Sequence, residues 1–221
     1  MRQAVEDYLK VIYKVQQRRK RASTSAIAES LGVSLPAATN MVQRLAEMGL
    51  LRYTPYRGVE LTEAGARIAL EVIRHHRLWE LFLARALNMP LDAVHAEAER
   101  LEHALSDTLE ETIDAALGYP TEDPHGDPIP AKDGTLREPA YVPLGTLPAG
   151  SRAVVRRVPD SDPALLRYLA SLGLVPGALV EVVEVAPFNG PVHLRVRDRQ
   201  HAIGREVAGR IFVEPAAEPN C

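Results

Sequence analysis

The spacing of apolar residues and the proline content change at Gly118, and this change limits the folds that the chain can adopt. Before Gly118, apolar residues recur every three or four positions, the spacing that predicts amphipathic helices. Residues 118–150 then hold seven of the seventeen prolines, a composition typical of a mostly irregular linker. Short β-branched runs follow, with one helical stretch after the first run. We therefore expect a mainly α protein that ends in a small β-barrel domain.

Composition excludes several classes of protein. No apolar run approaches the length of a membrane span, and the N-terminal stretch lacks the pattern of a signal peptide. The only cysteine, Cys221, excludes an internal disulfide framework and argues against a cysteine nucleophile or a thiolate metal cluster. A cytoplasmic protein without a membrane partner is the simplest interpretation.

Charge is distributed unevenly along the chain. Residues 1–60 hold ten Lys and Arg against five Asp and Glu, a balance of +5. Residues 61–221 hold sixteen against twenty-four, a balance of −8. A basic first part suits contact with phosphates, although the run from Arg18 to Arg21 supplies much of it and could reflect chance clustering.

Capping residues divide the first sixty positions into helices. Ser23 or Thr24 can begin a second helix that Gly32 ends, and Ser34 can begin a third. Residues 50–65 indicate two short strands around a Pro-Tyr-Arg-Gly turn. Together these elements predict a winged helix-turn-helix whose third helix enters the major groove of DNA by its N-terminal end. That helix is expected to bury Met41, Val42, Leu45 and Met48.

The third helix and the hairpin tip would supply the contacts with DNA. Small residues let a helix lie close to base edges, and basic or amide side chains reach phosphates. A helical hairpin packed for structure alone is the competing interpretation. The predicted DNA-contacting residues are Ser34, Pro36, Ala37, Thr39, Asn40, Gln43, Arg44 and Arg57, with Ala38 placed beside Ala37 against the bases.

The stretch "HAEAERLEH", residues 95–103, places histidines and carboxylates on one helix. At about 100° per residue, Glu99, Glu102 and His103 lie within about 100° of His95. They border the apolar face of the helix, where an unpaired carboxylate would be costly. Glu97 lies about 200° from His95 and belongs to the solvent side.

Further ligand types occur on two earlier helices. His76 and Glu80 are four residues apart on the preceding helix, and Asp7 lies on the first. A solvated face with incidental histidines is the alternative that spacing leaves open. Carboxylates and imidazoles without a thiolate suit Mn²⁺ or Fe²⁺ better than structural zinc.

The chain resembles the diphtheria toxin repressor/manganese transport regulator (DtxR/MntR) family of metal-dependent transcriptional regulators. The passages that carry the resemblance are "EDYLKVIY", "VSLPAATNMVQRLAEMGLLRYTPYRGVELTEAG", "RHHRLWELFL", "VHAEAERLEHALSD", "HGDPIP" and "LASLGLVPGALVEVVEV". The resemblance implies a winged helix-turn-helix domain over 1–62, a helical dimerisation and metal-binding domain over 63–118, a Pro-rich linker over 119–148 and an SH3-like (FeoA-like) domain over 149–215.

The resemblance also implies two metal sites in each subunit of a homodimer. The regulatory site would use Asp7, Glu99, Glu102 and His103, and the ancillary site would use His76, Glu80 and His95, with His76 near both. Asp7 and Glu99 stand where iron-responsive members have soft sulfur ligands, which resembles the manganese-responsive branch.

Two positions depart from the pattern of the family. Lys10 replaces a carboxylate that is frequent in the manganese branch, so a closely spaced two-metal cluster is in doubt. In the C-terminal domain Asp162 falls where the iron branch has an acidic ligand, but Leu165 replaces its companion. Asp160 or Asp162 therefore stays only a candidate ligand.

The leading hypothesis is a homodimeric, Mn²⁺- or Fe²⁺-activated repressor that binds double-stranded operator DNA and controls metal-transport genes. It requires no organic cofactor and is not an enzyme. The alternatives are a winged-helix regulator that responds to a non-metal ligand, and a metallohydrolase built on the carboxylate and histidine residues.

Overall fold

The computed structural model describes residues 2–18, 21–54 and 57–216, and it divides into two compact units. The first unit contains the chain up to His76 together with residues 100–111 and 130–136. The second contains residues 77–99, residues 112–129 and the chain from Arg137 onward. The long helix α4, Glu63–Leu87, contributes to both units.

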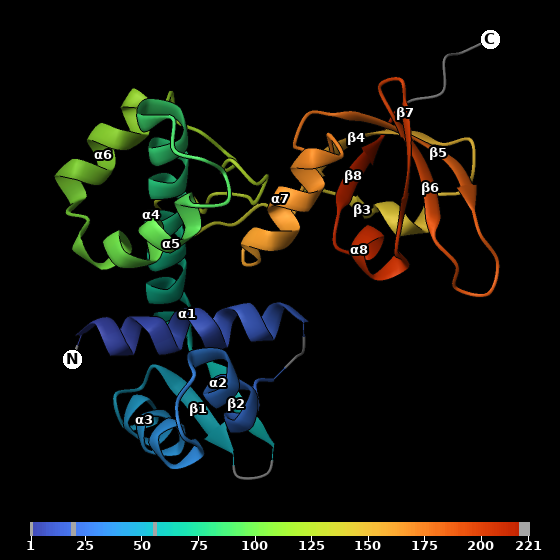
Figure 1. The fold of residues 1–221 in the computed structure, drawn as a ribbon. Helices are drawn as coiled ribbons and strands as arrows, with labels where there is room; N and C mark the ends of the chain where they lie inside the picture. Colours follow the sequence, from blue (N-terminus) through green and yellow to red (C-terminus); the bar gives the residue numbers. More distant parts are fainter. Residues whose placement is uncertain (1, 19–20, 55–56, 217–221) are drawn as a thin grey trace. The chain divides into compact units, whose positions relative to one another are not determined.

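The first unit is built on the helix α1, Arg2–Arg18, which packs against α2, Thr24–Leu31, and against a β-hairpin (Figure 1). The apolar stripe of α1 supplies the centre of the core, because Leu9 and Ile12 are fully buried. The predicted amphipathic first helix is confirmed. Other fully buried members of this core are Ile27, Ala38, Val42, Leu45 and Val59.

Local capping signals fix the helix-turn-helix. The Ser23 hydroxyl accepts a hydrogen bond from the Ala26 amide and begins α2. Gly32 ends α2 in the left-handed conformation, with φ of 63°. The Ser34 hydroxyl then accepts from the Ala37 amide and begins α3, Leu35–Glu47. These boundaries agree with the predictions because each depends on neighbouring residues alone.

The hairpin pairs β1, Leu51–Thr54, with β2, Gly58–Leu61, in antiparallel register. Gly65, in the first turn of α4, must be a glycine because a Cβ there would lie 2.0 Å from the Leu50 carbonyl oxygen. The Thr62 hydroxyl caps α4 by accepting a hydrogen bond from the Gly65 amide. Pro55 and Tyr56 of the predicted turn, and Arg19 and Lys20 of the basic run, lie outside the described residues.

The helical region differs from the prediction at one point. Helix α4 ends at Leu87, and α5, Val94–Leu101, follows after a short break. The segment η1, Glu102–Ala104, is a 3₁₀ turn, and Leu105 is extended before α6, Asp107–Ala116, begins. The expectation of one α-helix through His103 is therefore wrong. A 3₁₀ turn has three residues per turn, so the angular positions expected for Glu102 and His103 do not apply.

The C-terminal part of the second unit is an antiparallel six-stranded sheet in the order β3-β8-β4-β5-β6-β7 (Figure 1). The predicted inserted helix, α7, follows the strand β4 and packs Leu166 and Leu169 into the core of the domain. The bounds are β3 Val142–Pro143, η2 Leu144–Thr146, β4 Arg152–Arg157, α7 Pro163–Ser171, β5 Leu179–Val185, β6 Val192–Val196, β7 Arg199–Ile203, α8 Arg205–Gly209 and β8 Phe212–Pro215.

The proline-rich stretch is mostly irregular, as expected, apart from β3 and η2, and residues 119–129 pack within the second unit. Asp123 Oδ1 accepts hydrogen bonds from the amides of His125 and Asp127, both at 2.9 Å. The Val158 amide, beyond β4, donates to the His125 carbonyl oxygen. Gly126 has φ of 92°, and a Cβ there would lie 1.8 Å from the Arg156 carbonyl oxygen. The glycine therefore allows residues 123–127 to lie against β4.

Candidate metal centre

The first unit brings together Asp7, Glu102 and His103, named here the Asp7 cluster. One ligand atom from each of the three lies within 4.8 Å of the others. Asp7 comes from α1, whereas Glu102 and His103 come from the 3₁₀ turn. The 3₁₀ turn holds the two adjacent side chains close enough to meet Asp7. Sequence reasoning predicted all three residues as ligands.

Glu102 is fully buried at the centre of the Asp7 cluster. Its Oε1 accepts a hydrogen bond from Lys10 Nζ at 2.5 Å, and its Oε2 lies 2.6 Å from His76 Nδ1. Lys10 is itself buried, so its charge compensates the Glu102 carboxylate where water cannot. The amino group of Lys10 therefore lies beside the carboxylate of Glu102 within the cluster.

The His103 ring lies between two carboxylates of α1. Its Nε2 is 2.8 Å from Asp7 Oδ1 and 3.3 Å from Glu102 Oε1. Its Nδ1 is 2.7 Å from Glu6 Oε2. Glu6 was absent from the predicted site, and its place beside Asp7 in "VEDYLK" was the only signal available.

Burial and neighbouring charge act differently on the two carboxylates of α1. Burial raises the pKa of Asp7, although the charge of His103 opposes the shift. Burial also acts to raise the pKa of Glu6, but hydrogen bonds from Arg2 and His103 outweigh it and leave that pKa below its ordinary value. Glu6 is therefore ionised at neutral pH.

The second unit holds a separate group, Glu80, Asp123 and His125, named here the Glu80 cluster. One ligand atom of each lies within 4.8 Å of the others, and all three side chains are buried. Glu80 was a predicted ligand, but Asp123 and His125 were not. They belong to "TEDPHGDPIP", which we interpreted as linker, and the motif "DPHGD" gave no ligand spacing that could identify them.

Within the Glu80 cluster, Asp123 Oδ2 and His125 Nδ1 are buried without a hydrogen-bond partner among the described residues. The His125 atom lies 3.9 Å from Glu80 Oε2, and the Asp123 atom lies 3.9 Å from Arg77 Nε, both beyond hydrogen-bond distance. Buried polar atoms are nearly always satisfied, so a bound ion or an ordered water could complete this arrangement.

The Glu80 cluster also shifts the pKa of its members. Burial, together with the nearby charges of Glu80 and Asp127, raises the pKa of Asp123 well above its ordinary range. Burial lowers the pKa of His125, but its interactions with Glu80 and Asp123 are stronger and raise it to about 9. Without a metal ion, His125 thus holds its proton at neutral pH.

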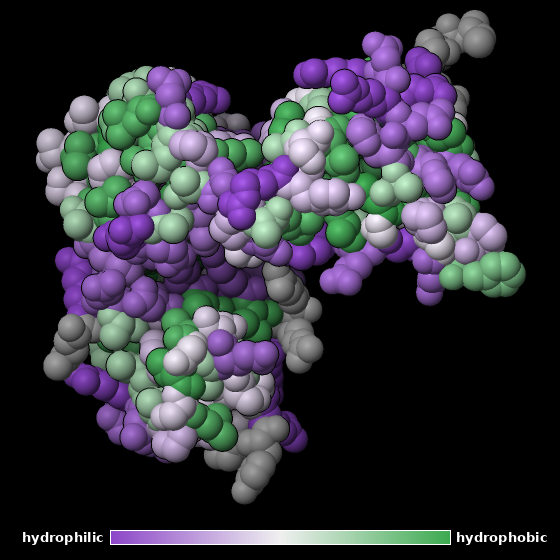
Figure 2. Space-filling view, viewed as in Figure 1, coloured by the Kyte–Doolittle hydropathy of each residue, from purple (hydrophilic) through white to green (hydrophobic). Residues whose placement is uncertain are grey.

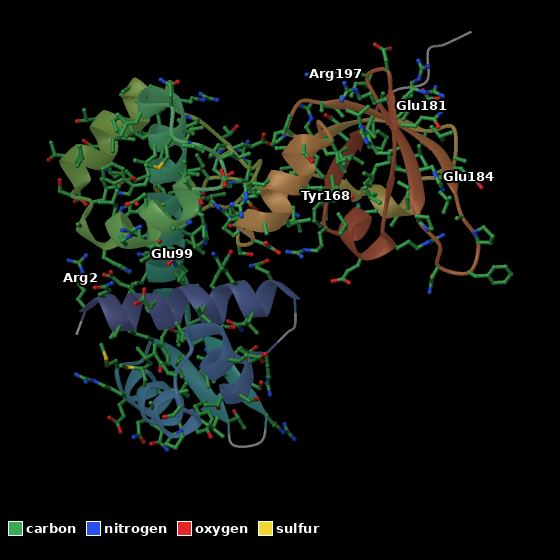
Figure 3. All side chains as sticks on the ribbon, viewed as in Figure 1. Arg2, Glu99, Tyr168, Glu181, Glu184 and Arg197 are labelled. Atoms are coloured by element: carbon green, nitrogen blue, oxygen red, sulfur yellow. The ribbon has the colours of Figure 1, made fainter. Side chains whose placement is uncertain are left out.

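The remaining predicted ligands lie beside Glu80. His95 Nδ1 is 2.9 Å from Glu80 Oε1 and 3.8 Å from Asp160 Oδ2. Glu99 Oε1 is 3.8 Å from His95 Nε2, with two fifths of its side chain exposed on α5 (Figure 3). Asp162 has another task, because it caps α7 by accepting a hydrogen bond from the Leu165 amide. Of the two acidic candidates in the C-terminal domain, only Asp160 is therefore placed near a predicted ligand.

The predicted DNA-contacting residues are mostly exposed. Ala38 is fully buried, so the expectation that it contacts bases is wrong, and Met48 is exposed rather than buried. Thr39 is half-buried, and its hydroxyl donates to the Leu35 carbonyl oxygen at 2.8 Å. Figure 2 shows apolar and hydrophilic residues intermixed over the surface of this unit. The exposed predicted residues are Ser34, Pro36, Ala37, Asn40, Gln43, Arg44 and Arg57.

Three family descriptions match successive parts of the chain. They are the N-terminal DNA-binding domain of iron-dependent repressors over residues 1–59, the metal-binding and dimerisation domain of iron-dependent repressors over 62–131, and the FeoA domain over 142–215. Among the described residues, no helix is long and apolar enough to cross a membrane.

Individual relatives cover nearly the whole chain. The iron-dependent repressor IdeR of Mycobacterium tuberculosis (strain ATCC 25618 / H37Rv) is 36% identical over 221 residues, which cover 95% of this chain and 96% of the relative. The diphtheria toxin repressor of Corynebacterium efficiens is 32% identical and covers 90% and 93%. A solved manganese-dependent transcriptional repressor in complex with manganese is 39% identical, covers 96% and 100%, and superposes with a TM-score of 0.88.

Proposed function

We propose that this chain is a homodimeric repressor activated by Mn²⁺. The premise is that the chain belongs to the iron-dependent repressor family of metal-dependent, DNA-binding transcriptional repressors, and not to a family of enzymes. Its targets would be operators of metal-transport genes. The observation that carries the proposal is the Asp7 cluster, in which a carboxylate of α1 meets Glu102 and His103. Fe²⁺ is the alternative effector, because the same oxygen and nitrogen ligands suit both ions.

The donor sets fit divalent ions of this type. Asp7, Glu102 and His103, with Glu99 and His76 as further candidates, would hold one ion. Glu80 and His95 would hold a second, and Asp123 and His125 extend that set because their unsatisfied buried atoms face it. Neither set contains a sulfur ligand, which favours Mn²⁺ or Fe²⁺ over ions that select thiolates.

The mechanism follows from which elements carry the ligands. A bound divalent ion supplies positive charge where the carboxylates meet. Asp7 would then be held to Glu102 and His103, and α1 would be fixed against the turn that carries them. Since α1 packs on α2 and the hairpin, fixing α1 also fixes the helix-turn-helix. In a homodimer, this sets how two copies of α3 meet successive major grooves.

The experiment is operator binding by fluorescence anisotropy while Mn²⁺, Fe²⁺ and Zn²⁺ are titrated separately. We expect Mn²⁺ to activate operator binding, although the Irving–Williams order allows Zn²⁺ to bind at a lower free concentration. We expect the double variant Glu102→Ala, His103→Ala to abolish activation. Glu63→Ala, on the exposed start of α4, is the matched control and should respond as the wild type does. Operator binding that is unaffected by divalent ions, or by the double variant, would contradict the proposal.

A further inference from the structure

We infer that Glu6 is a positioning residue for the metal centre: its carboxylate holds the His103 ring so that Nε2 is presented to the ion. The inference rests on the proposed function only in taking Asp7 and His103 as ligands of one ion. Glu6 is buried, and its side chain is held from both sides. The sequence prediction had no role for it.

The two nitrogens of His103 face different partners. Nε2 lies 2.8 Å from Asp7 Oδ1 and 3.3 Å from Glu102 Oε1, the two carboxylates of the Asp7 cluster. Nδ1 lies 2.7 Å from Glu6 Oε2. The two nitrogens are at opposite edges of the imidazole and point away from each other. An ion shared by Asp7 and His103 must therefore lie on the Nε2 side, out of reach of Glu6.

This geometry assigns the proton of the neutral ring. A ligating imidazole needs a lone pair on the metal-facing nitrogen and carries its proton on the other. Glu6 Oε2 is an acceptor 2.7 Å from Nδ1, so Nδ1 carries the proton and donates a hydrogen bond to Glu6. A carboxylate behind a ligating histidine fixes the ring orientation and raises the basicity of the ligand. Glu6 thus acts on the ion only through His103.

Arg2 completes the arrangement from the start of α1, where Figure 3 labels it. Its Nε donates to Glu6 Oε1 at 2.7 Å, across one helical turn. Oε1 is thereby occupied, and Oε2 is directed toward His103. The Arg2 side chain is 83% exposed, so its contribution is weaker than that of Glu6. These contacts predict that substitution of the buried Glu6 weakens metal binding more than substitution of the exposed Arg2.

The test is calorimetric titration of the full-length protein with Mn²⁺, comparing Glu6→Gln with the wild type. The Gln side chain has nearly the same shape and can still accept from Nδ1, but it lacks the negative charge. We expect the affinity of one class of Mn²⁺ site to fall about 10–100-fold, with the number of bound ions unchanged. The other class, which we assign to the Glu80 cluster, should stay within about twofold. Arg2→Gln should weaken the same class by about threefold or less.

A spectroscopic measurement separates positioning from a general loss of structure. With Co²⁺ bound, Glu6→Gln should shift the visible absorption bands of one site and leave those of the other in place. Glu29→Gln, an exposed change on α2, should alter neither affinity nor spectrum. Unchanged affinity in Glu6→Gln would overturn the inference. A parallel loss of affinity in both classes, together with a lower unfolding midpoint of the metal-free protein, would also overturn it. Loss of one bound ion would overturn it as well. If metal does not control operator binding, the proposed function fails while these titrations still decide the role of Glu6.

Discussion

The Asp7 cluster and the Glu80 cluster use the same kinds of residue but differ in how they are satisfied without metal. In the Asp7 cluster, Glu102 accepts hydrogen bonds from Lys10 and His76. In the Glu80 cluster, Asp123 Oδ2 and His125 Nδ1 have no hydrogen-bond partner among the described residues. The first cluster therefore carries its own internal cation, whereas the second contains buried polar atoms that no hydrogen bond satisfies.

Buried carboxylates can therefore affect the stability of the fold in opposite directions. A carboxylate compensated by a buried lysine contributes to folding, because removing it strands the lysine charge. A carboxylate whose pKa is raised by burial, such as Asp7 or Asp123, opposes folding to the extent that it is ionised. We therefore expect the Asp7 cluster to act as the switch and the Glu80 cluster to act as a site whose occupation stabilises the second unit.

The largest expected effect is on Glu102. Glu102→Ala should lower the free energy of unfolding of the metal-free protein by about 3–5 kcal/mol, because Lys10 loses its buried partner. Urea unfolding in the presence of a chelator measures this, with the exposed change Glu63→Ala as control. A loss below about 1 kcal/mol would show that the internal ion pair does not stabilise the first unit.

The next effect is a pH dependence that belongs to the Glu80 cluster. The pKa of His125 is about 9 in the folded chain, above its ordinary 6.5, so the folded state binds more protons between these values. The stabilisation is fully present below pH 6.5 and is lost as the pH rises through about 9, by about 3 kcal/mol at most. Chelator-treated protein should thus unfold more easily at pH 9 than at pH 6.5. In His125→Gln, whose amide can still donate to the Leu91 carbonyl oxygen, this trend should flatten; an equally steep trend would assign it elsewhere.

A smaller effect, opposite in sign to that of Glu102, is expected at Asp123. Asp123→Asn keeps the Oδ1 acceptor for the amides of His125 and Asp127 but removes a disfavoured charge. The metal-free protein should become more stable at pH 7, by less than Glu102→Ala destabilises it, while one class of Mn²⁺ binding is lost. A stability decrease in urea unfolding would remove the contrast between the two clusters.

The smallest effect concerns the edge of the Glu80 cluster. Asp160→Asn should weaken one class of Mn²⁺ binding by about two- to fivefold, because Asp160 lies 3.8 Å from His95 Nδ1. Asp162→Asn is the matched control, since an asparagine also caps a helix and Asp162 faces the Leu165 amide. Equal titration curves for both variants would show that neither aspartate takes part.

Much of the fold follows from local signals in the sequence. Ser23, Gly32 and Ser34 set the helix-turn-helix because caps depend on residues three or four positions away. The end of α5 was missed because "ERLEHAL" has no glycine or proline, and the change to a 3₁₀ turn accompanies the packing of Glu102 in the core.

The sequence predicts candidate ligands where they share a helical face or match the pattern of the family. His76, Glu80 and His95 are examples. Asp123 and His125 escaped prediction because they reach Glu80 only through the close approach of Gly126 to β4, a contact between distant parts of the chain. Glu6 escaped because its role depends on which way the His103 ring faces, and no spacing contains that information.

The hydrogen bond between Lys10 and Glu102 has a consequence for sensing range. An ion that enters the Asp7 cluster must compete with a tethered ammonium group that is always present. That competition lowers the apparent affinity and moves the response to higher free concentrations of the ion. A regulator needs this lower affinity, because a site that stays occupied at every free ion concentration cannot respond when that concentration falls. Under the proposed function, Lys10 would set a threshold, and its substitution should move the free ion concentration at which operator binding begins.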